Sequence, residues 1–565
     1  MILVLCLILT LLSACAAAGE PEEGREGQEE QGNQETQPEK NGEVYILFTS
    51  DVHCGIDQGF GYAGLKQIRD TLESEGYTTV LVDDGDSIQG ETIGTLTKGE
   101  AIIELMNRIG YDVAVPGNHE FDYGTERFRE LTEKADFPYI CCNFTYMDER
   151  VFDPYVIIEA AGLRIAFVGI STPTTITSST PSFFRDSSGE YVYGFMNDDS
   201  GEKVYNAVQS AVDEARSKGA DLVYAMAHTG LFLDDSPWTY ADIIEHTSGI
   251  DVYLDGHSHD TEQVVVKNKD GNSVVRSACG TKLSCIGYSH ISADGKVLDT
   301  GIWSWPNSTQ AQDLMGFRND ISDAVEEAKK ELAKLTDQVV AHSDVELTIN
   351  DPVEKDNSGN PIRMIRRAET NLGDLCADVV RNSIGADIGV FGGGGIRTDI
   401  HRGDVTYGDI IKVWPFQNTI CVIEATGQQI MDALEWGARM VPGETGGFLH
   451  VSGLTYEIHV SVPNSCTEDS SGMMSGIEGE RRVRNVMVDG TAIDPDRIYT
   501  VAGTDYTLLD NGDGTTAFNG ARVVTENAGL DSQVLIDYIT DHLGGTIGAE
   551  YADPYGQGRI TIIED

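Results

Sequence analysis

Histidine, aspartate and asparagine recur where short apolar runs end within the first 260 residues. The turns read SDVHCG, DDGD, GNHEFD, AHTG and DGHSH, and they offer Asp51, His53, Asp86, Asn118, His228, His257 and His259. One such residue is usually a cap for the following helix, but capping does not explain the repetition at five run ends. Carboxylate, imidazole and amide ligands suit divalent Zn, Mn, Fe or Co and not a soft thiolate site. The pattern predicts a metal centre.

The apolar runs before these turns have the length and β-branched composition of buried strands. We expect strands at 44–50, 79–85, 112–117, 164–170, 221–228 and 251–257. Segments between them carry apolar residues at helical spacing, such as 102–109 and 204–212. This alternation predicts an α/β layered fold with buried sheets. Because the carboxyl ends of the strands in an open α/β sheet converge on one crevice, residues distant in sequence meet there.

The chain of 565 residues is long enough for two to four domains. We expect a first domain at 43–310, an amphipathic connecting helix over 311–335 within a linker at 311–337, and a second α/β domain at 338–565. A glycine-rich turn lies at 392–395, and the polar stretches 350–361 and 462–480 are typical of surface loops.

Charge and cysteine content exclude several classes of function. The 39 basic and 92 acidic residues give a net charge of −53, which excludes non-specific attraction to nucleic acid as the main activity. Eight cysteines follow the first 18 residues without any CxxC pair, so zinc-finger and thioredoxin-type sites are excluded.

The amino terminus has the composition of an export signal. Residues 1–18 are mostly aliphatic, and LSAC at 12–15 resembles a bacterial lipoprotein cleavage box with Cys15 as the lipidated residue. No Lys or Arg precedes the apolar run, so a plain secretory signal remains the alternative. Residues 19–42 lack aliphatic and aromatic side chains, which predicts a disordered acidic spacer. We therefore expect a lipid-anchored protein at the surface of a bacterial cell.

The order Asp-x-His, Gly-Asp, Gly-Asn-His-Glu, His, Gly-His-x-His resembles the calcineurin-like metallophosphoesterases. GNHEFD together with GGGIR, PFQNT and NGDG is similar to the 5′-nucleotidase family, which includes bacterial periplasmic UDP-sugar hydrolases and animal ecto-5′-nucleotidases. The resemblance covers roughly residues 43–560. It implies an N-terminal αββα sandwich, a helical linker and a C-terminal α/β domain that binds substrate.

The resemblance also implies two cations. One would be held by Asp51, His53, Asp86 and His259, and the other by Asp86, Asn118, His228 and His257, with Asp86 bridging. Two cations about 3.5–4 Å apart activate a shared water and clamp the attacking and leaving oxygens of a displacement at phosphorus.

His119 directly follows a candidate ligand, and adjacent side chains normally diverge, so we do not expect it to bind metal. The resemblance implies that His119 stabilises the transition-state oxygens and protonates the leaving group, with Asp122 orienting the imidazole and raising its pKa. The alternative is that His119 hydrogen-bonds only the loop backbone. Glu120 is expected to be structural.

The second domain supplies the substrate residues that the resemblance implies. Arg397 would reach the anionic substrate, because a guanidinium binds phosphate oxygens bidentately. Phe416 and Tyr506 would sandwich a nucleobase, and Asn418 and Asp513 would contact base or ribose. The Tyr506–Asp513 spacing is one residue longer than in the family.

Two departures concern specificity. Gly392 stands where many relatives have Asn or Ser, and Asn371 stands where the animal enzymes have arginine. A third cationic contact is available from Arg363, Arg366 or Arg367, with a solvated basic run as the alternative.

Together these features predict an extracellular dimetal phosphomonoesterase that releases nucleoside and phosphate from nucleoside 5′-phosphates, with UDP-sugars and nucleoside di- and triphosphates as further candidate substrates. The alternatives are a 2′,3′-cyclic nucleotide phosphodiesterase with 3′-nucleotidase activity, a thiosulfate-ester hydrolase, and a non-catalytic nucleotide-binding surface protein.

Overall fold

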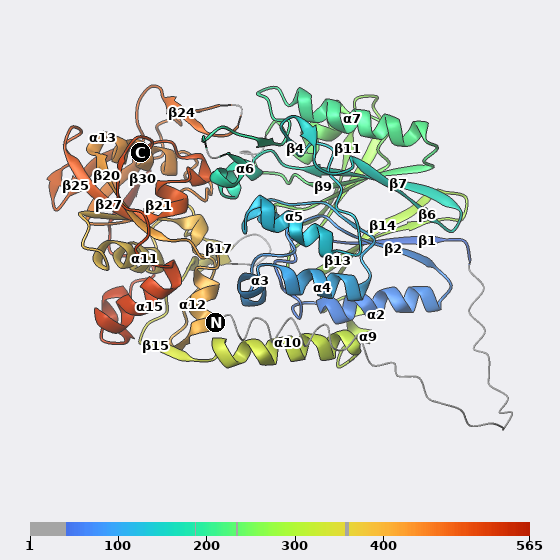
Figure 1. The fold of residues 1–565 in the computed structure, drawn as a ribbon, viewed down its shortest axis with the longest axis horizontal. Coiled ribbons are helices and arrows are strands. Elements are labelled where there is room, and N and C mark those ends of the chain that lie inside the picture. The colour runs from blue at the N-terminus through green and yellow to red at the C-terminus, as the bar shows by residue number, and fades with distance from the viewer. Residues whose placement is uncertain (1–40, 187, 233–235, 356–360, 470, 565) are drawn as a thin grey trace.

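A computed structural model describes residues 41–564 apart from 187, 233–235, 356–360 and 470 (Figure 1). The predicted signal, Cys15 and nearly all of the predicted spacer lie outside the described residues. Within the described part of the chain, no helix has the length and apolar character that a membrane crossing requires.

Two large mixed sheets form the centre of the first domain. One has the order β14-β13-β1-β2-β3, with β1, β2 and β3 parallel; its strands are β1 (Val44–Thr49), β2 (Thr78–Asp83), β3 (Val113–Ala114), β13 (Cys285–Ile291) and β14 (Val297–Ser304). The other has the order β11-β12-β10-β9-β7-β6, with β7, β9, β10 and β12 parallel; its strands are β6 (Tyr155–Ala160), β7 (Leu163–Ser171), β9 (Leu222–His228), β10 (Val252–Asp255), β11 (Thr261–Lys267) and β12 (Ser273–Cys279).

The two sheets pack face to face between helices. Ile46 and Phe48 of β1 share one core with Phe167 of β7 and Leu254 of β10, whereas Leu47 faces the helices outside. Both faces of β1 are therefore buried, which explains its unbroken apolar run. The helices are α2 (Gly61–Ser74), α4 (Glu100–Ile109) and α10 (Asp320–Thr336) beside the first sheet, and α7 (Glu202–Ser217) and α8 (Tyr240–His246) beside the second. This αββα sandwich confirms the predicted fold class.

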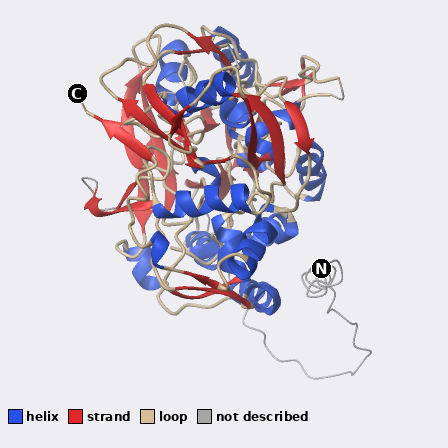
Figure 2. Ribbon diagram, turned by 90° about the vertical axis from the view of Figure 1, so that its left-hand side faces the viewer, coloured by secondary structure: helices blue, strands red, loops and turns tan. Residues whose placement is uncertain are grey.

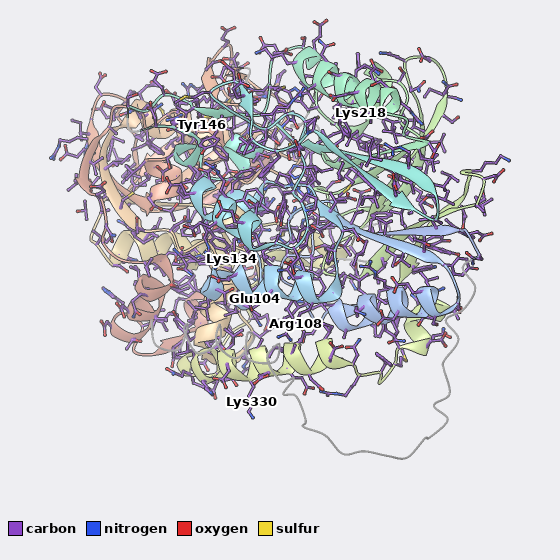
Figure 3. The ribbon with its side chains drawn as sticks, turned by 45° about the vertical axis from the view of Figure 1, so that its right-hand side comes forward. Glu104, Arg108, Lys134, Tyr146, Lys218 and Lys330 are labelled. Atoms are coloured by element: carbon purple, nitrogen blue, oxygen red, sulfur yellow. The ribbon has the colours of Figure 1, made fainter. Side chains whose placement is uncertain are left out.

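Charged side chains lie on the outer faces of these helices. Figure 3 labels Glu104 and Arg108 on α4, Lys218 directly after α7 and Lys330 on α10. The apolar residues of the same helices are buried, as the helical spacing of 102–109 and 204–212 predicts.

The single connecting helix predicted over 311–335 is wrong. The segment forms a short α9 (Thr309–Asp313) and then α10, which begins at Asp320. Gly316 between them has φ +79°, outside the helical range, and Asn319 caps α10 through a capping box with Ser322. The domain boundaries themselves stay a prediction.

The second domain is a further α/β assembly around two cores. Its five-stranded sheet has the order β21-β18-β27-β20-β28, with β18 (Ile388–Gly392), β20 (Ile420–Thr426), β21 (Leu449–Ser452), β27 (Ile498–Thr504) and β28 (Arg522–Thr525). A four-stranded sheet contains β22 (Leu454–His459), β25 (Val483–Val488), β26 (Thr491–Ala492) and β30 (Ile560–Ile563). The helices include α11 (Asn371–Asn382), α12 (Tyr407–Val413), α13 (Gly427–Ala438) and α15 (Asp531–Asp541). Figure 2 shows that helices and strands lie side by side throughout the described part of the molecule.

The two polar stretches predicted as surface loops contain strands. β16 (Asn350–Lys355) pairs with β17 (Pro361–Arg363), and β23 (Cys466–Glu468) pairs with β24 (Met474–Ile477). Their polar composition conceals these short antiparallel pairs, which bury little apolar surface. The glycine-rich turn is confirmed as a single 3₁₀ turn, Gly393–Gly395, directly after β18.

Candidate metal centre and substrate site

The carboxyl ends of four parallel strands carry candidate ligands. Asp51 and His53 follow β1, Asp86 follows β2, His228 is the last residue of β9, and His257 and His259 follow β10. Five of these residues adopt left-handed backbone conformations: Asp51 (φ 50°), His53 (45°), Asp86 (59°), His257 (80°) and His259 (56°). This conformation costs free energy in residues other than glycine and gathers at functional sites. The tight turns aim side chains from separate strands at one point.

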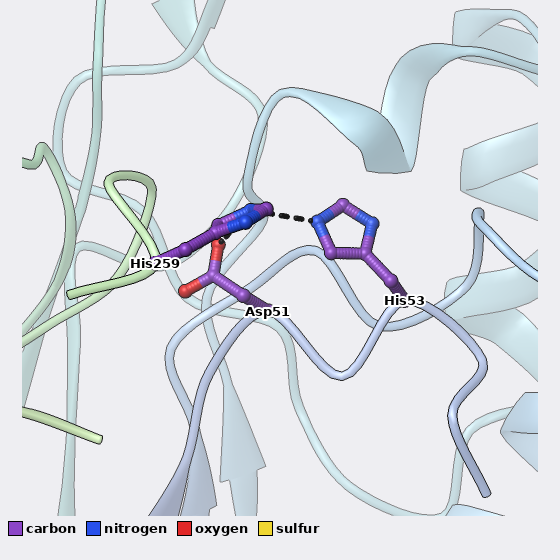
Figure 4. Close-up of side chains that lie close together, drawn as sticks. All are labelled: Asp51, His53 and His259. Carbon is purple, nitrogen blue, oxygen red and sulfur yellow. Dashed lines mark hydrogen bonds and ion pairs between the residues drawn. The ribbon is translucent and has the colours of Figure 1, made fainter. Parts of the chain in front are cut away.

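Asp51, His53 and His259 form the first ligand group. One potential ligand atom from each lies within 4.8 Å of the others. The Nε2 atoms of His53 and His259 are 3.1 Å apart, and Nε2 of His259 lies 3.5 Å from Oδ1 of Asp51 (Figure 4).

Asp86, His228 and His257 form the second group, and His53, Asp86 and His119 form a third that shares a residue with each of the other two. Nε2 of His228 lies 3.1 Å from Oδ2 of Asp86, and Oδ1 of Asn118 lies 2.9 Å from Nδ1 of His257. The same Asp86 oxygen is 3.8 Å from Nε2 of His53. Asp86 therefore lies between the two groups.

The hydrogen bonds of the imidazoles test whether these residues fit cations. Nδ1 of His53 bonds the carbonyl of Gln89 at 3.0 Å, and Nδ1 of His228 bonds the carbonyl of Asp84 at 2.8 Å. Because a carbonyl accepts, each ring carries a proton on Nδ1 and turns Nε2 toward the centre. Nε2 of His228 is buried and lacks a well-directed hydrogen bond despite its nearness to Asp86. Burial lowers the pKa of His53 to about 3, which keeps its imidazole neutral. The donor set fits two divalent cations.

Glu120 holds the loop that carries Asp86 against the loop that begins at Gly117. Its carboxylate accepts backbone N–H bonds from Asp86 and Ser87 at 2.8 Å each and from Gly117 at 2.7 Å. A Cβ at Gly117 would lie 2.3 Å from Oδ1 of Asp86, so only glycine fits there. These contacts confirm that Glu120 is a structural carboxylate.

His119 and Asp122 are brought together beside the ligands. His119 begins the 3₁₀ turn His119–Phe121, and its Nδ1 lies 2.5 Å from Oδ2 of Asp122. Ser179 donates a hydrogen bond of 3.0 Å to the other Asp122 oxygen. Although burial opposes the charged imidazolium, Asp122 and Asp86 raise the pKa of His119. With Nδ1 committed to Asp122, Nε2 of His119 is the nitrogen left for a substrate.

Residues of the second domain reach this centre. The ring centroid of Phe416 lies 6.1 Å from that of His119, with the planes 26° apart. The guanidinium carbon of Arg397 lies 5.7 Å from the Phe416 centroid. Burial and the charge of Arg363 lower the pKa of Arg397, while Asp122 and Asp86 oppose the shift. The structure thus groups Arg397 and Phe416 with the ligands.

Tyr506 and Asp513 form a separate contact. The Tyr506 hydroxyl donates to the carbonyl of Thr177 in the first domain at 3.1 Å and accepts from the backbone N–H of Asp513 at 3.0 Å. Burial raises the pKa of the Asp513 carboxyl to about 6. Asn418 lies two residues after Phe416, and its backbone N–H donates to Asp531 at 3.1 Å.

The sequence left three arginines open as the additional cation. Arg366 is the neighbour of Arg397: burial and then the charges of Arg363 and Arg397 hold the pKa of Arg366 well below its usual value. Arg363 bonds Glu444 at 2.6 Å, whereas Arg367 contacts the carbonyl of Pro442 at 3.5 Å. Arg363 and Arg366 are therefore the arginines whose charges interact with that of Arg397.

Two contacts were not predicted from the sequence. Thr95 bonds the loop that carries Phe416, and Ser179 bonds Asp122. Neither residue belongs to a motif, and both contacts arise from tertiary packing.

A cavity of about 450 Å³ lies elsewhere, between the first domain, α10 and α12. Cys54, Thr92, Leu332 and Lys412 are among its lining residues, and none of the predicted site residues lines it. Ligand chemistry, and not cavity size, therefore locates the site. The described cysteines are all free, and all are buried except Cys466, which is half-buried. Burial raises the pKa of the Cys54 thiol.

Two family models match the chain. Residues 44–261 match the calcineurin-like phosphoesterase model, and residues 339–520 match the model of the 5′-nucleotidase C-terminal domain. The chain belongs to the 5′-nucleotidase family of metallophosphoesterases. It is accordingly a metal-dependent phosphohydrolase of the 5′-nucleotidase type.

Relatives of this family align along most of the chain. The trifunctional nucleotide phosphoesterase YfkN of Bacillus subtilis is 25% identical over 93% of this chain, although the chain spans only 35% of its length. Protein UshA of Yersinia enterocolitica is 25% identical over 92% of this chain and 94% of its own. The crystal structure of a 5′-nucleotidase precursor from Thermus thermophilus has a TM-score of 0.73 at 24% identity, covering 93% of this chain and 100% of that one, and shows the same fold.

Proposed function

We propose that this 5′-nucleotidase family member hydrolyses nucleoside 5′-phosphates to nucleoside and phosphate. The observation that carries the proposal is the position of Phe416 and Arg397 against His119, beside the two ligand groups. A single nucleotide could then stack its base on Phe416, pair its phosphate with Arg397 and reach the metal centre.

The residues that would hold the cations are Asp51, His53, Asp86 and His259 for one, and Asp86, Asn118, His228 and His257 for the other. When bound, divalent cations of the Zn, Mn, Co or Fe class supply Lewis acidity, which lowers the pKa of a water and neutralises phosphoryl charge. Asp86 suits the bridging role because it lies between the groups.

His119 would act on the substrate through its free nitrogen. Asp122 holds the proton on Nδ1 and favours the charged imidazolium, so Nε2–H can donate to a phosphoryl oxygen or to the leaving oxygen. Ser179 keeps the Asp122 carboxylate in place.

The second domain would bind the rest of the substrate. Arg397 would pair with phosphate oxygens, and the Phe416 ring would stack on the base. Tyr506, Asn418 and Asp513 complete the proposed pocket. Tyr506 already bonds both domains, which suits a site formed at their junction.

We also propose that the enzyme is exported and anchored through lipidated Cys15. This rests on the composition of residues 1–18. The substrate would then be an extracellular nucleotide.

The test is an assay of the purified protein on AMP, UDP-glucose, 2′,3′-cyclic nucleotides and an aryl phosphate, with and without a chelator. We expect adenosine and phosphate from AMP, loss of activity with chelator and recovery with Zn, Mn or Co. Hydrolysis of cyclic nucleotides alone would favour the phosphodiesterase, and nucleotide binding without turnover of any compound would refute the proposal.

A further inference from the structure

Thr95 of the first domain bonds the loop that carries Phe416 on both sides of that residue. Its hydroxyl donates to the carbonyl of Pro415 at 3.1 Å, and its own carbonyl accepts from the Gln417 side-chain amide at 3.0 Å. Thr95 is 1% exposed and belongs to α3 (Thr92–Thr97), which packs against α12 of the second domain (Figure 1). These two bonds cross the domain interface.

The loop is anchored to its own domain at both ends. Trp414 at its start is buried in the core of the second domain, and the backbone of Asn418 is held by Asp531. Between these anchors Gln417 has φ 57°, which is costly for a residue with a side chain. The bond from Gln417 to Thr95 supports that conformation at the residue next to Phe416.

We infer that Thr95 is a positioning residue for nucleobase recognition: it sets the Phe416 ring beside His119 when the two domains are together. The inference rests on the proposed stacking role of Phe416. Thr95 touches neither the ligand groups nor the proposed phosphate contacts, so its effect is on base recognition and not on phosphate chemistry.

The same helix provides a matched control. Thr97 is 4% exposed, and its hydroxyl donates to the carbonyl of Ile93 at 2.7 Å, inside the first domain. Thr95→Val and Thr97→Val make the same chemical change in one helix, but only the first removes a bond to the Phe416 loop. Gln417→Leu removes the second bond from the other domain.

Two readouts separate this inference from the proposed function. The first is amide hydrogen exchange of peptides covering 414–419, which needs no substrate. The second is kcat/KM for AMP relative to ribose 5-phosphate, which has the same phosphate ester and sugar but no base. Thermal melting confirms that each variant folds.

We expect faster exchange in 414–419 for Thr95→Val and Gln417→Leu, and a fall of about fivefold in the AMP to ribose 5-phosphate ratio, the size of one neutral hydrogen bond. The fall should lie mainly in KM for AMP. Thr97→Val should keep the exchange rate and the ratio of the wild type.

Unchanged exchange in both variants would overturn the positioning role. Faster exchange with an unchanged ratio would show that the contact does not govern base recognition, which also overturns the inference. If the wild type hydrolyses neither compound, the proposed function fails, while exchange still decides whether Thr95 holds the loop.

Discussion

Nδ1 of His119 lies 2.5 Å from Oδ2 of Asp122, and this contact leaves Nε2 as the nitrogen of His119 that a substrate could reach. Nδ1–H already donates to Asp122, so the ring can donate to a substrate only through Nε2. The pair resembles other histidine–carboxylate arrangements in which the carboxylate fixes the tautomer and stabilises the imidazolium.

Replacement of His119 tests its proposed role in proton donation. His119→Ala should lower kcat for AMP by about 10²- to 10⁴-fold, the usual contribution of a general acid. The loss should be smaller for 4-nitrophenyl phosphate, because its leaving group needs no proton. Asp122→Asn should show the same pattern more weakly. Steady-state kinetics on both substrates, with equal metal content in each variant, would check this; equal losses on both would contradict leaving-group protonation.

Glu120 should matter for stability. Glu120→Ala leaves three buried backbone N–H groups without their acceptor and should lower the free energy of unfolding by about 3 kcal/mol. Denaturant unfolding measures this. Glu133→Ala, an exposed residue of α5 (Thr125–Lys134), is the control and should change stability by less than about 0.5 kcal/mol. A Glu120 variant as stable as the control would disprove the structural role.

The buried His450 should make the protein less stable in mild acid. Burial lowers its pKa to about 4 from an ordinary 6.5, so the unfolded chain takes up a proton at higher pH than the folded one. The contribution is complete above pH 6.5 and falls as the pH drops toward 4, by about 3 kcal/mol in total. His450→Gln should flatten the stability profile over this range, whereas the exposed His542→Gln should not. Identical slopes in wild type and His450→Gln would contradict the prediction.

Relative motion of the domains is expected to accompany turnover, because the substrate would bridge them. The side-chain amide of Asn197 lies 3.1 Å from the hydroxyl of Ser471 in the second domain. A disulfide between Asn197→Cys and Ser471→Cys should therefore slow kcat, and reductant should restore it. Rates that do not differ between the oxidised and reduced double variant would exclude a required rotation.

The strands and the candidate ligands of the first domain could be predicted from the sequence because one rule joins them. A short apolar run that ends in Asp, His or Asn specifies both a buried strand and the position of its last side chains. His228 at the end of β9 and Asp86 after β2 meet for this reason. The left-handed backbone conformation of His53 and Asp86 could not be predicted from the sequence, because it follows from the packing of the turns.

The contact between Thr95 and the loop that carries Phe416 could not be predicted from the sequence. Thr95 is an ordinary helical residue in sequence, and its bonds to Pro415 and Gln417 depend on how two folded domains meet. The sequence predicts one helix across Gly316 because the amphipathic spacing continues on both sides of it. Gly316 and the Asn319 cap are the local features that mark the break.

Asp86 would help to hold both of the cations that phosphate release is proposed to need, and this role can be tested directly. The most direct measurement is the metal content and AMP hydrolysis of the wild type and Asp86→Asn, both shown to fold by thermal melting. The wild type should hold about two divalent ions per chain and release phosphate, whereas Asp86→Asn should lose metal and most activity. Full activity in folded Asp86→Asn, or in metal-stripped wild type, would contradict the account.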